Sequence, residues 1–110
     1  MAIEQQCREA SPEECRQAIE KGGCRVIDLR TPAEFREGHL ADAVNIDYYA
    51  HDFRARITAL DPKQTFVVYC RRGIRGQKSM EILRDAGFIR VLNIAGGFEA
   101  WSRSGHPVQR

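Results

Sequence analysis

The apolar residues of this chain gather in short runs, and three of these runs are nearly continuous. The runs "CRVIDL" (24–29), "TFVVYC" (65–70) and "RVLNI" (90–94) are rich in β-branched and apolar side chains. Runs of this length and composition are typical of strands that are buried on both faces of a sheet. The brief run "AVNI" (43–46) has the same character. We expect one strand in each of these four ranges.

The segments between the runs carry helix signals instead. The segment "SPEECRQAIEKGG" (11–23) opens with Ser11 as a cap and Pro12 at the first helical position, and it ends on a glycine pair. The tetrapeptide "TPAE" (31–34) repeats this capping pattern directly after the first predicted strand. Further helices are expected over 51–60, between Cys70 and Gly87, and over 98–101.

Strands that alternate with helices in this way favour an α/β domain with a mainly parallel sheet. No internal repeat, low-complexity tract or linker divides the sequence, so we expect residues 1–110 to form a single domain. Folding of a chain this long buries roughly two thirds of the surface that the unfolded chain exposes. Apolar residues make up 43% of the sequence and charged residues 29%, which argues against a disordered or fibrous chain.

Charge and hydropathy exclude two classes of partner. Seventeen basic and fifteen acidic residues leave a net charge of +2, which is too small to indicate a nucleic-acid-binding surface. No segment approaches the roughly 20 apolar residues that a membrane-spanning helix needs. We therefore expect neither a nucleic acid nor a membrane as a partner. The segment "MAIEQQCREASPEEC" lacks the basic start and apolar stretch of a secretory signal, so we expect a cytoplasmic protein.

The four cysteines are widely and unequally spaced, and no two are separated by just two residues. This spacing predicts neither a zinc site nor a redox dithiol. In a reducing compartment we expect Cys7, Cys15 and Cys24 to be free thiols that serve as small, partly buried side chains.

Cys70 differs from the other three cysteines in its surroundings. It ends a predicted buried strand, and Arg71, Arg72 and Arg75 follow it closely. Ligand sites of parallel α/β sheets lie beyond the carboxyl ends of the strands. Backbone N–H groups of a curled loop, the positive end of a helix and nearby cations all favour a thiolate over a thiol. The loop is therefore predicted to hold a reactive thiolate beside an anionic substrate, which arginine side chains bind well.

Three motifs in this order and spacing resemble the rhodanese domain, the sulfurtransferase family. They are "VIDLRTPAEFREGHLADAVNI", "VVYCRRGIRG" and "LNIAGGFEAW", and the matched core runs from about residue 24 to 101. The resemblance implies a single rhodanese domain over 1–110, with a five-stranded, mainly parallel sheet and helices on both faces. It further implies that no metal or organic cofactor is required.

The same resemblance implies residue roles and a reaction. Cys70 is the expected catalytic nucleophile, which takes a sulfur atom from a small anionic donor such as thiosulfate and becomes a persulfide. The expected acceptor is cyanide, glutathione, thioredoxin or a sulfur-carrier protein. The expected substrate-binding residues form the loop after the nucleophile, and they are Arg71, Arg72, Gly73, Ile74 and Arg75. Their N–H groups are expected to surround the sulfur. The side chains of Arg72 and Arg75 are expected to bind the substrate.

Loop length separates sulfur transfer from related chemistry. In the related dual-specificity phosphatases of the cell-cycle type, the arginine lies six positions after the cysteine, whereas here the sixth position is Gly76 and the fifth is Arg75. A shorter loop suits a bare sulfur atom better than a tetrahedral phosphate, and Tyr69 stands before Cys70 where tyrosine phosphatases carry a histidine. Two alternatives stay open: a rhodanese-like protein-binding or sulfur-carrier regulatory module, and an arsenate reductase or phosphatase.

Other polar and aromatic residues are predicted to support the site or the core. Asp28 and Arg30 resemble the family's structural pair, and His39 matches the family pattern as a hydrogen-bonded structural histidine. Ser79 either reaches back to the loop or is an ordinary helix residue. Tyr48 and Tyr49 are candidates for the mouth of the site. Phe98 and Trp101 are expected to anchor the last helix, and His51 and His106 are expected to face solvent.

Overall fold

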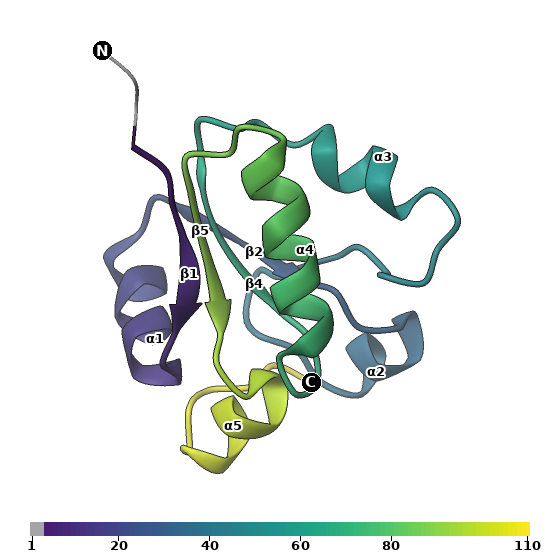
Figure 1. Cartoon of the computed structure of the whole chain (residues 1–110). Helices are drawn as coiled ribbons and strands as arrows, with labels where there is room; N and C mark the ends of the chain where they lie inside the picture. Colours follow the sequence, from purple (N-terminus) through teal and green to yellow (C-terminus); the bar gives the residue numbers. More distant parts are fainter. Residues whose placement is uncertain (1–3) are drawn as a thin grey trace.

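The computed structural model describes residues 4–110, and within this range it forms one sheet with helices packed on both faces (Figure 1). The five strands follow the order β1-β5-β4-β2-β3, and every neighbouring pair is parallel. The strands are β1 (Gln6–Ala10), β2 (Cys24–Asp28), β3 (Val44–Asn45), β4 (Thr65–Tyr69) and β5 (Arg90–Ile94). The helices are α1 (Pro12–Lys21), α2 (Pro32–Glu37), α3 (Phe53–Thr58), α4 (Ile74–Asp85) and α5 (Gly97–Arg103).

The predicted α/β class with a mainly parallel sheet is confirmed, and all five strands of the described range are parallel. Because the strands are parallel, their carboxyl ends meet at one edge of the sheet. The central strand β4 pairs with β2 on one side and β5 on the other, and its last residue is followed directly by Cys70. The fold thus places the loop after Cys70 in the middle of this edge.

The two faces of the sheet bury separate hydrophobic clusters. On one face, α3 and α4 pack their apolar residues, such as Ile57 and Leu83, over Val68 of β4. On the other face, α1 and α5 contribute Cys15 and Trp101 to a second cluster. Neighbouring strand residues point to opposite faces, so a strand covered on both sides reads as a continuous apolar run.

Local signals in the sequence account for how α1 and α2 begin. The Ser11 hydroxyl accepts the N–H of Glu14 at the start of α1. At the start of α2, the Thr31 hydroxyl accepts the N–H of Glu34, and the Glu34 carboxylate accepts the N–H of Thr31, which completes a capping box. Both helices carry a proline in the first turn, as predicted.

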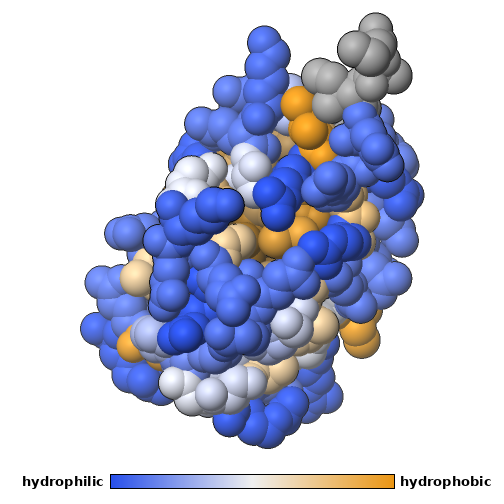
Figure 2. Space-filling model, turned by 90° about the vertical axis from the view of Figure 1, so that its left-hand side faces the viewer, coloured by the Kyte–Doolittle hydropathy of each residue, from blue (hydrophilic) through white to orange (hydrophobic). Residues whose placement is uncertain are grey.

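Strand β1 could not be delimited from the sequence. It lies at the edge of the sheet beside β5, and its residues are mostly exposed and polar. The face that carries β1 and α1 is largely hydrophilic, with small and separate hydrophobic areas (Figure 2). Polar side chains along an edge strand limit pairing with other chains. Because of these polar side chains, β1 has no apolar run that would indicate a strand.

The three cysteines outside the loop are free thiols held by the core. Cys15 is fully buried, and this burial raises the pKa of its thiol to about 12. Burial also raises the pKa of Cys7 and of Cys24, which are only partly buried. These thiols are therefore poor nucleophiles at neutral pH.

Within residues 4–110, every helix is too short or too polar to cross a bilayer.

Candidate active site

Cys70 is held at the floor of a loop that donates backbone N–H groups to its sulfur. The Sγ atom lies 3.0 Å from the backbone nitrogen of Gly73 and 3.3 Å from that of Gly76, and the residue is 1% exposed. Gly73 has φ +107°, a left-handed conformation that side chains rarely adopt, so this turn requires glycine. Two N–H donors directed at one sulfur stabilise a negative charge on it.

The first turn of α5 fixes the orientation of the first two peptide groups of the loop. The carbonyl of Cys70 accepts the N–H of Phe98 at 2.8 Å, and the carbonyl of Arg71 accepts the N–H of Glu99 at 3.1 Å. The N–H of a trans peptide points opposite to its carbonyl, so the next two N–H groups face away from α5. A Cβ atom on Gly97 would lie only 2.5 Å from the Cys70 carbonyl oxygen, which explains the glycine at this close approach.

An open hollow of about 350 Å³ lies above the sulfur. Among the loop residues, Ile74 and the first two arginines are exposed at its rim. Tyr49 lies at the mouth of the hollow, as the sequence suggested, whereas Tyr48 packs against the core beside Phe53. The lining residues are Tyr49, Cys70, Arg71, Arg72, Ile74 and Arg75.

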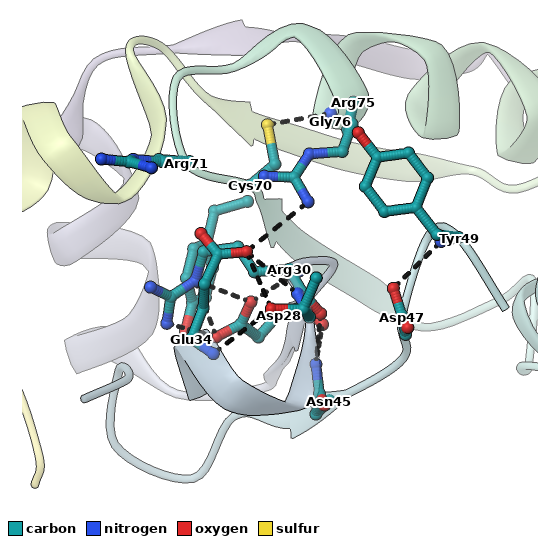
Figure 3. A network of polar contacts seen from close by, with 12 residues as sticks. Asp28, Arg30, Glu34, Asn45, Asp47, Tyr49, Cys70, Arg71, Arg75 and Gly76 are labelled. Carbon is teal, nitrogen blue, oxygen red and sulfur yellow. Dashed lines mark hydrogen bonds and ion pairs between the residues drawn. The ribbon is translucent and has the colours of Figure 1, made fainter. Parts of the chain in front are cut away.

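The three arginines of the loop occupy different environments. The side chain of Arg75 is 16% exposed and extends beside Cys70, between the Tyr49 ring and Glu34 (Figure 3). Its guanidinium lies 3.8 Å from the Glu34 carboxylate and 5.3 Å from the centre of the Tyr49 ring. Arg71 and Arg72 are exposed instead, and each pairs with Glu99, at 3.7 Å and 3.1 Å. Of the two expected clamps, Arg75 is held beside the sulfur, and Arg72 lies at the rim.

Glu34 links the cap of α2 to the loop after Cys70. Burial acts to raise the pKa of its carboxyl group, but hydrogen bonds from Thr31 and the charges of Arg75 and Arg30 outweigh burial and lower the pKa. The carboxylate is therefore charged at neutral pH and attracts the Arg75 guanidinium. The sequence predicts Glu34 as a residue of the helix cap, and it does not indicate the contact with Arg75.

A buried polar network supports the edge of the sheet next to the loop (Figure 3). The Arg30 guanidinium donates to the Asp28 carboxylate at 2.7 Å and to the Gly38 carbonyl at 2.6 Å. The Tyr69 hydroxyl donates to the same carboxylate at 2.7 Å and accepts the N–H of Leu40 at 3.1 Å. Burial, followed by the charge of Asp28, strongly raises the pKa of Tyr69, so its hydroxyl stays protonated. Asp28 and Arg30 make no contact with the sulfur and connect structural elements.

His39 and Ser79 also make local structural contacts. The His39 ring stacks on Phe35 with centroids 3.8 Å apart, and its Nδ1 atom lies 2.8 Å from the Phe35 carbonyl oxygen. The Ser79 hydroxyl donates to the Arg75 carbonyl at 2.8 Å, one turn earlier in α4, which is the contact of an ordinary helix serine.

The expectation that both remaining histidines face solvent was wrong for His106. Its ring packs edge-on against Trp101 with centroids 4.9 Å apart, and its side chain is 11% exposed beside Glu13. The chain turns back after α5, and its backbone carbonyl at Pro107 accepts the indole N–H of Trp101. The sequence around His106 carries no motif that would have predicted this turn or the burial of the ring. His51 is exposed, as expected.

Two residues that contact the loop were not predicted. Gly76 donates its N–H to the sulfur, although the family resemblance implied the N–H groups of Arg71 through Arg75 as the donors. Asn93 donates its side-chain amide to the Gly73 carbonyl. Asn93 lies in a strand 20 residues after the glycine it contacts, and only the parallel pairing of β4 with β5 brings them together.

Comparison with known proteins decides the family. The model of the rhodanese-like domain family matches residues 11–104. The chain belongs to this family. A rhodanese-related protein of known structure from Thermoplasma volcanium has a TM-score of 0.82 and 25% sequence identity, over 93% of this chain and 97% of that one.

Relatives of this rhodanese-like chain are named as sulfurtransferases. A sulfurtransferase from Allochromatium vinosum is 36% identical over 83 residues, which make up 76% of either chain. The thiosulfate sulfurtransferase GlpE from Pseudomonas aeruginosa is 35% identical over 98 residues, 89% of this chain and 86% of that one. The predicted family is thus confirmed, and these relatives support a sulfurtransferase role.

Proposed function

We propose that the protein moves a sulfane sulfur from a small anionic donor such as thiosulfate to an acceptor, through a persulfide on Cys70. The observation that carries this proposal is the pair of N–H groups, from Gly73 and Gly76, directed at the Cys70 sulfur. A persulfide ends in a sulfur anion, and N–H donors around it lower its energy without a metal ion.

The first half of the reaction forms the persulfide. The Cys70 thiolate attacks the outer sulfur of thiosulfate, and a new S–S bond forms. The S–S bond within thiosulfate breaks, and its electron pair leaves with sulfite. Arg75, held beside the sulfur by Glu34, binds the donor and stabilises the negative charge on the departing sulfite.

The second half returns the enzyme to its starting state. The acceptor thiolate or cyanide attacks the outer sulfur of the persulfide, and the electron pair of that S–S bond returns to the Cys70 sulfur. The acceptor leaves as a persulfide, or as thiocyanate when cyanide is used. Glutathione, thioredoxin and a sulfur-carrier protein are the thiol acceptors to be compared.

The loop favours sulfur over a tetrahedral oxyanion as the group held at its floor. The two donor N–H groups already converge on one atom, Sγ, and Gly76 occupies the sixth position that holds the arginine in the related phosphatases. A phosphate or arsenate group has three outer oxygens that need donors of their own. We therefore expect turnover of thiosulfate and little turnover of aryl phosphate or arsenate.

A turnover assay tests this proposal against both alternatives. The purified protein and the Cys70→Ser variant are assayed with thiosulfate and cyanide, with an aryl phosphate, and with arsenate and a thiol reductant. Thiocyanate formation that is lost in the variant supports sulfur transfer. Substantial phosphate release or arsenate reduction supports the oxyanion chemistry instead. No turnover of any substrate, together with a stable partner in affinity capture, supports a protein-binding module.

A further inference from the structure

Asn93 lies behind the active-site loop and is enclosed by the protein. It belongs to β5, and its exposed fraction is 0%. Its side-chain Nδ2 atom donates to the Gly73 carbonyl at 3.1 Å. The reverse orientation of the amide would direct one oxygen at another, so the donor must face the loop. A buried amide that contacts the loop and not the hollow is placed to act on the shape of the loop.

The bond from Asn93 bears on the peptide group that joins Gly73 to Ile74. The Gly73 carbonyl accepts a second hydrogen bond, from the N–H of Gln77 at 2.9 Å, which is the first bond of α4. Because its carbonyl accepts two hydrogen bonds, this peptide group cannot rotate freely. Its N–H, which is that of Ile74, points away from the body of the helix. Asn93 thus fixes where the loop ends and where the helix begins.

The other atom of the amide bears on Gly76. A Cβ atom on Gly76 would lie 2.0 Å from the Asn93 Oδ1 atom, so the amide packs directly on this glycine. The Oδ1 atom is buried and has no hydrogen-bond partner within residues 4–110, which has a cost in folding free energy. An apolar side chain would avoid that cost but would lose the bond to Gly73.

We propose that Asn93 is a positioning residue, because its single buried amide contacts both Gly73 and Gly76, the two residues whose N–H groups reach the Cys70 sulfur. Asn93 touches neither the sulfur nor the hollow, and it acts through the backbone of the loop. With the amide in place, both N–H groups converge on Sγ and favour the thiolate and, on the proposed function, the persulfide. The inference rests on that function only for its second half, because the thiolate exists before any sulfur donor binds.

The test compares Asn93→Ala with Val91→Ala. Val91 is buried in the same strand two residues earlier, where it pairs with Phe66, four residues before Cys70. Both substitutions remove buried atoms, so both are expected to lower the melting temperature. Alkylation of Cys70 by iodoacetamide, measured by peptide mass at a series of pH values, reports the thiolate without a sulfur donor.

For Asn93→Ala we expect the rate of Cys70 alkylation at neutral pH to fall by about threefold or more, because the two N–H donors no longer converge on Sγ. In a single turnover with thiosulfate, persulfide formation should slow by about tenfold, because small displacements of catalytic groups have effects of this size. The KM for thiosulfate should change little, since Arg75 is untouched. Val91→Ala should leave the alkylation profile and the rate unchanged.

An alkylation profile of Asn93→Ala that matches that of Val91→Ala would overturn the inference. If Asn93→Ala does not fold, Asn93→Ser, which keeps a shorter donor, is measured in the same way. It should show a smaller change in the same direction, and an unchanged profile would again overturn the inference. A changed profile in a protein that takes no sulfur from thiosulfate would leave the role of Asn93 standing and remove the proposed function.

Discussion

The carboxylate of Glu34 lies 3.8 Å from the guanidinium of Arg75, so one charged group belongs to the cap of α2 and also contacts the loop after Cys70. In the sequence, Glu34 follows β2 and Arg75 follows β4. Since β2 pairs with β4, their carboxyl ends lie side by side. The pair therefore holds the one loop arginine that is shielded from solvent next to Cys70.

Removing this charge should weaken substrate binding more than chemistry. In Glu34→Gln the capping box is kept, because glutamine also accepts the N–H of the cap residue, but the attraction to Arg75 is lost. We expect the KM for thiosulfate to rise about threefold to tenfold, with kcat changed by less than about twofold. Glu37→Gln, at an exposed position of the same helix, is the matched control and should have wild-type kinetics. An unchanged KM in Glu34→Gln would show that Arg75 does not depend on Glu34.

The lowered pKa of Glu34 predicts how stability depends on pH. A carboxyl group with a folded-state pKa below its ordinary value of about 4.5 stabilises the folded state above that pH, and the contribution is lost as the pH falls through the folded-state pKa. Wild-type protein should therefore melt at a higher temperature than Glu34→Gln at pH 7. The difference should shrink as the pH is lowered below about 4. A difference that stays constant down to pH 2.5 would contradict this origin.

The arginines of the loop should differ in importance. Arg75→Ala removes the partly buried cation beside the sulfur, and we expect kcat/KM for thiosulfate to fall by about 100-fold, as for other well-placed charged donors. Arg72→Ala removes an exposed side chain that already pairs with Glu99, so a loss of about threefold is expected. The residual activity of Arg72→Ala should depend less on salt than that of the wild type. Equal losses in the two variants would contradict the difference in their placement.

The buried hydroxyl of Tyr69 should matter for stability and not for chemistry. In Tyr69→Phe the N–H of Leu40 loses its acceptor and the Asp28 carboxylate loses a donor, which should cost about 1–3 kcal/mol of the free energy of unfolding. Urea denaturation measures the loss, and Tyr49→Phe at the exposed mouth serves as the control. The rate per folded molecule of Tyr69→Phe should equal that of the wild type at a temperature where both are folded. A stability equal to that of the wild type would show that the network contributes little.

Patterns local in sequence were the most predictable part of this protein. The capping residues Ser11 and Thr31 start helices where expected, and the run that ends at Cys70 is the central strand. Both conclusions depend only on hydrogen bonds and side chains within a few residues of each other. The polar edge strand β1 gave no such signal, because exposure on an edge removes the apolar pattern.

Contacts between distant segments were the least predictable. Glu34 carries a clear helix-cap signal, and nothing near it in the sequence indicates that it also faces Arg75. Asn93 lies within an apolar run, and the run itself does not indicate that the amide contacts Gly73. In each case the partner is set by which strands pair, and strand order is a property of the whole sheet.

The proposed function requires that Cys70 accepts a sulfur atom from the donor. Its most direct test is the intact mass of the protein after incubation with thiosulfate and removal of the excess reagent, with Cys24→Ser as a control that keeps the loop intact. We expect one added sulfur atom on the wild type and on the control, and this atom should be removed by a thiol and be absent from Cys70→Ser. An unchanged mass of the wild type, or an added sulfur that persists in Cys70→Ser, would contradict it.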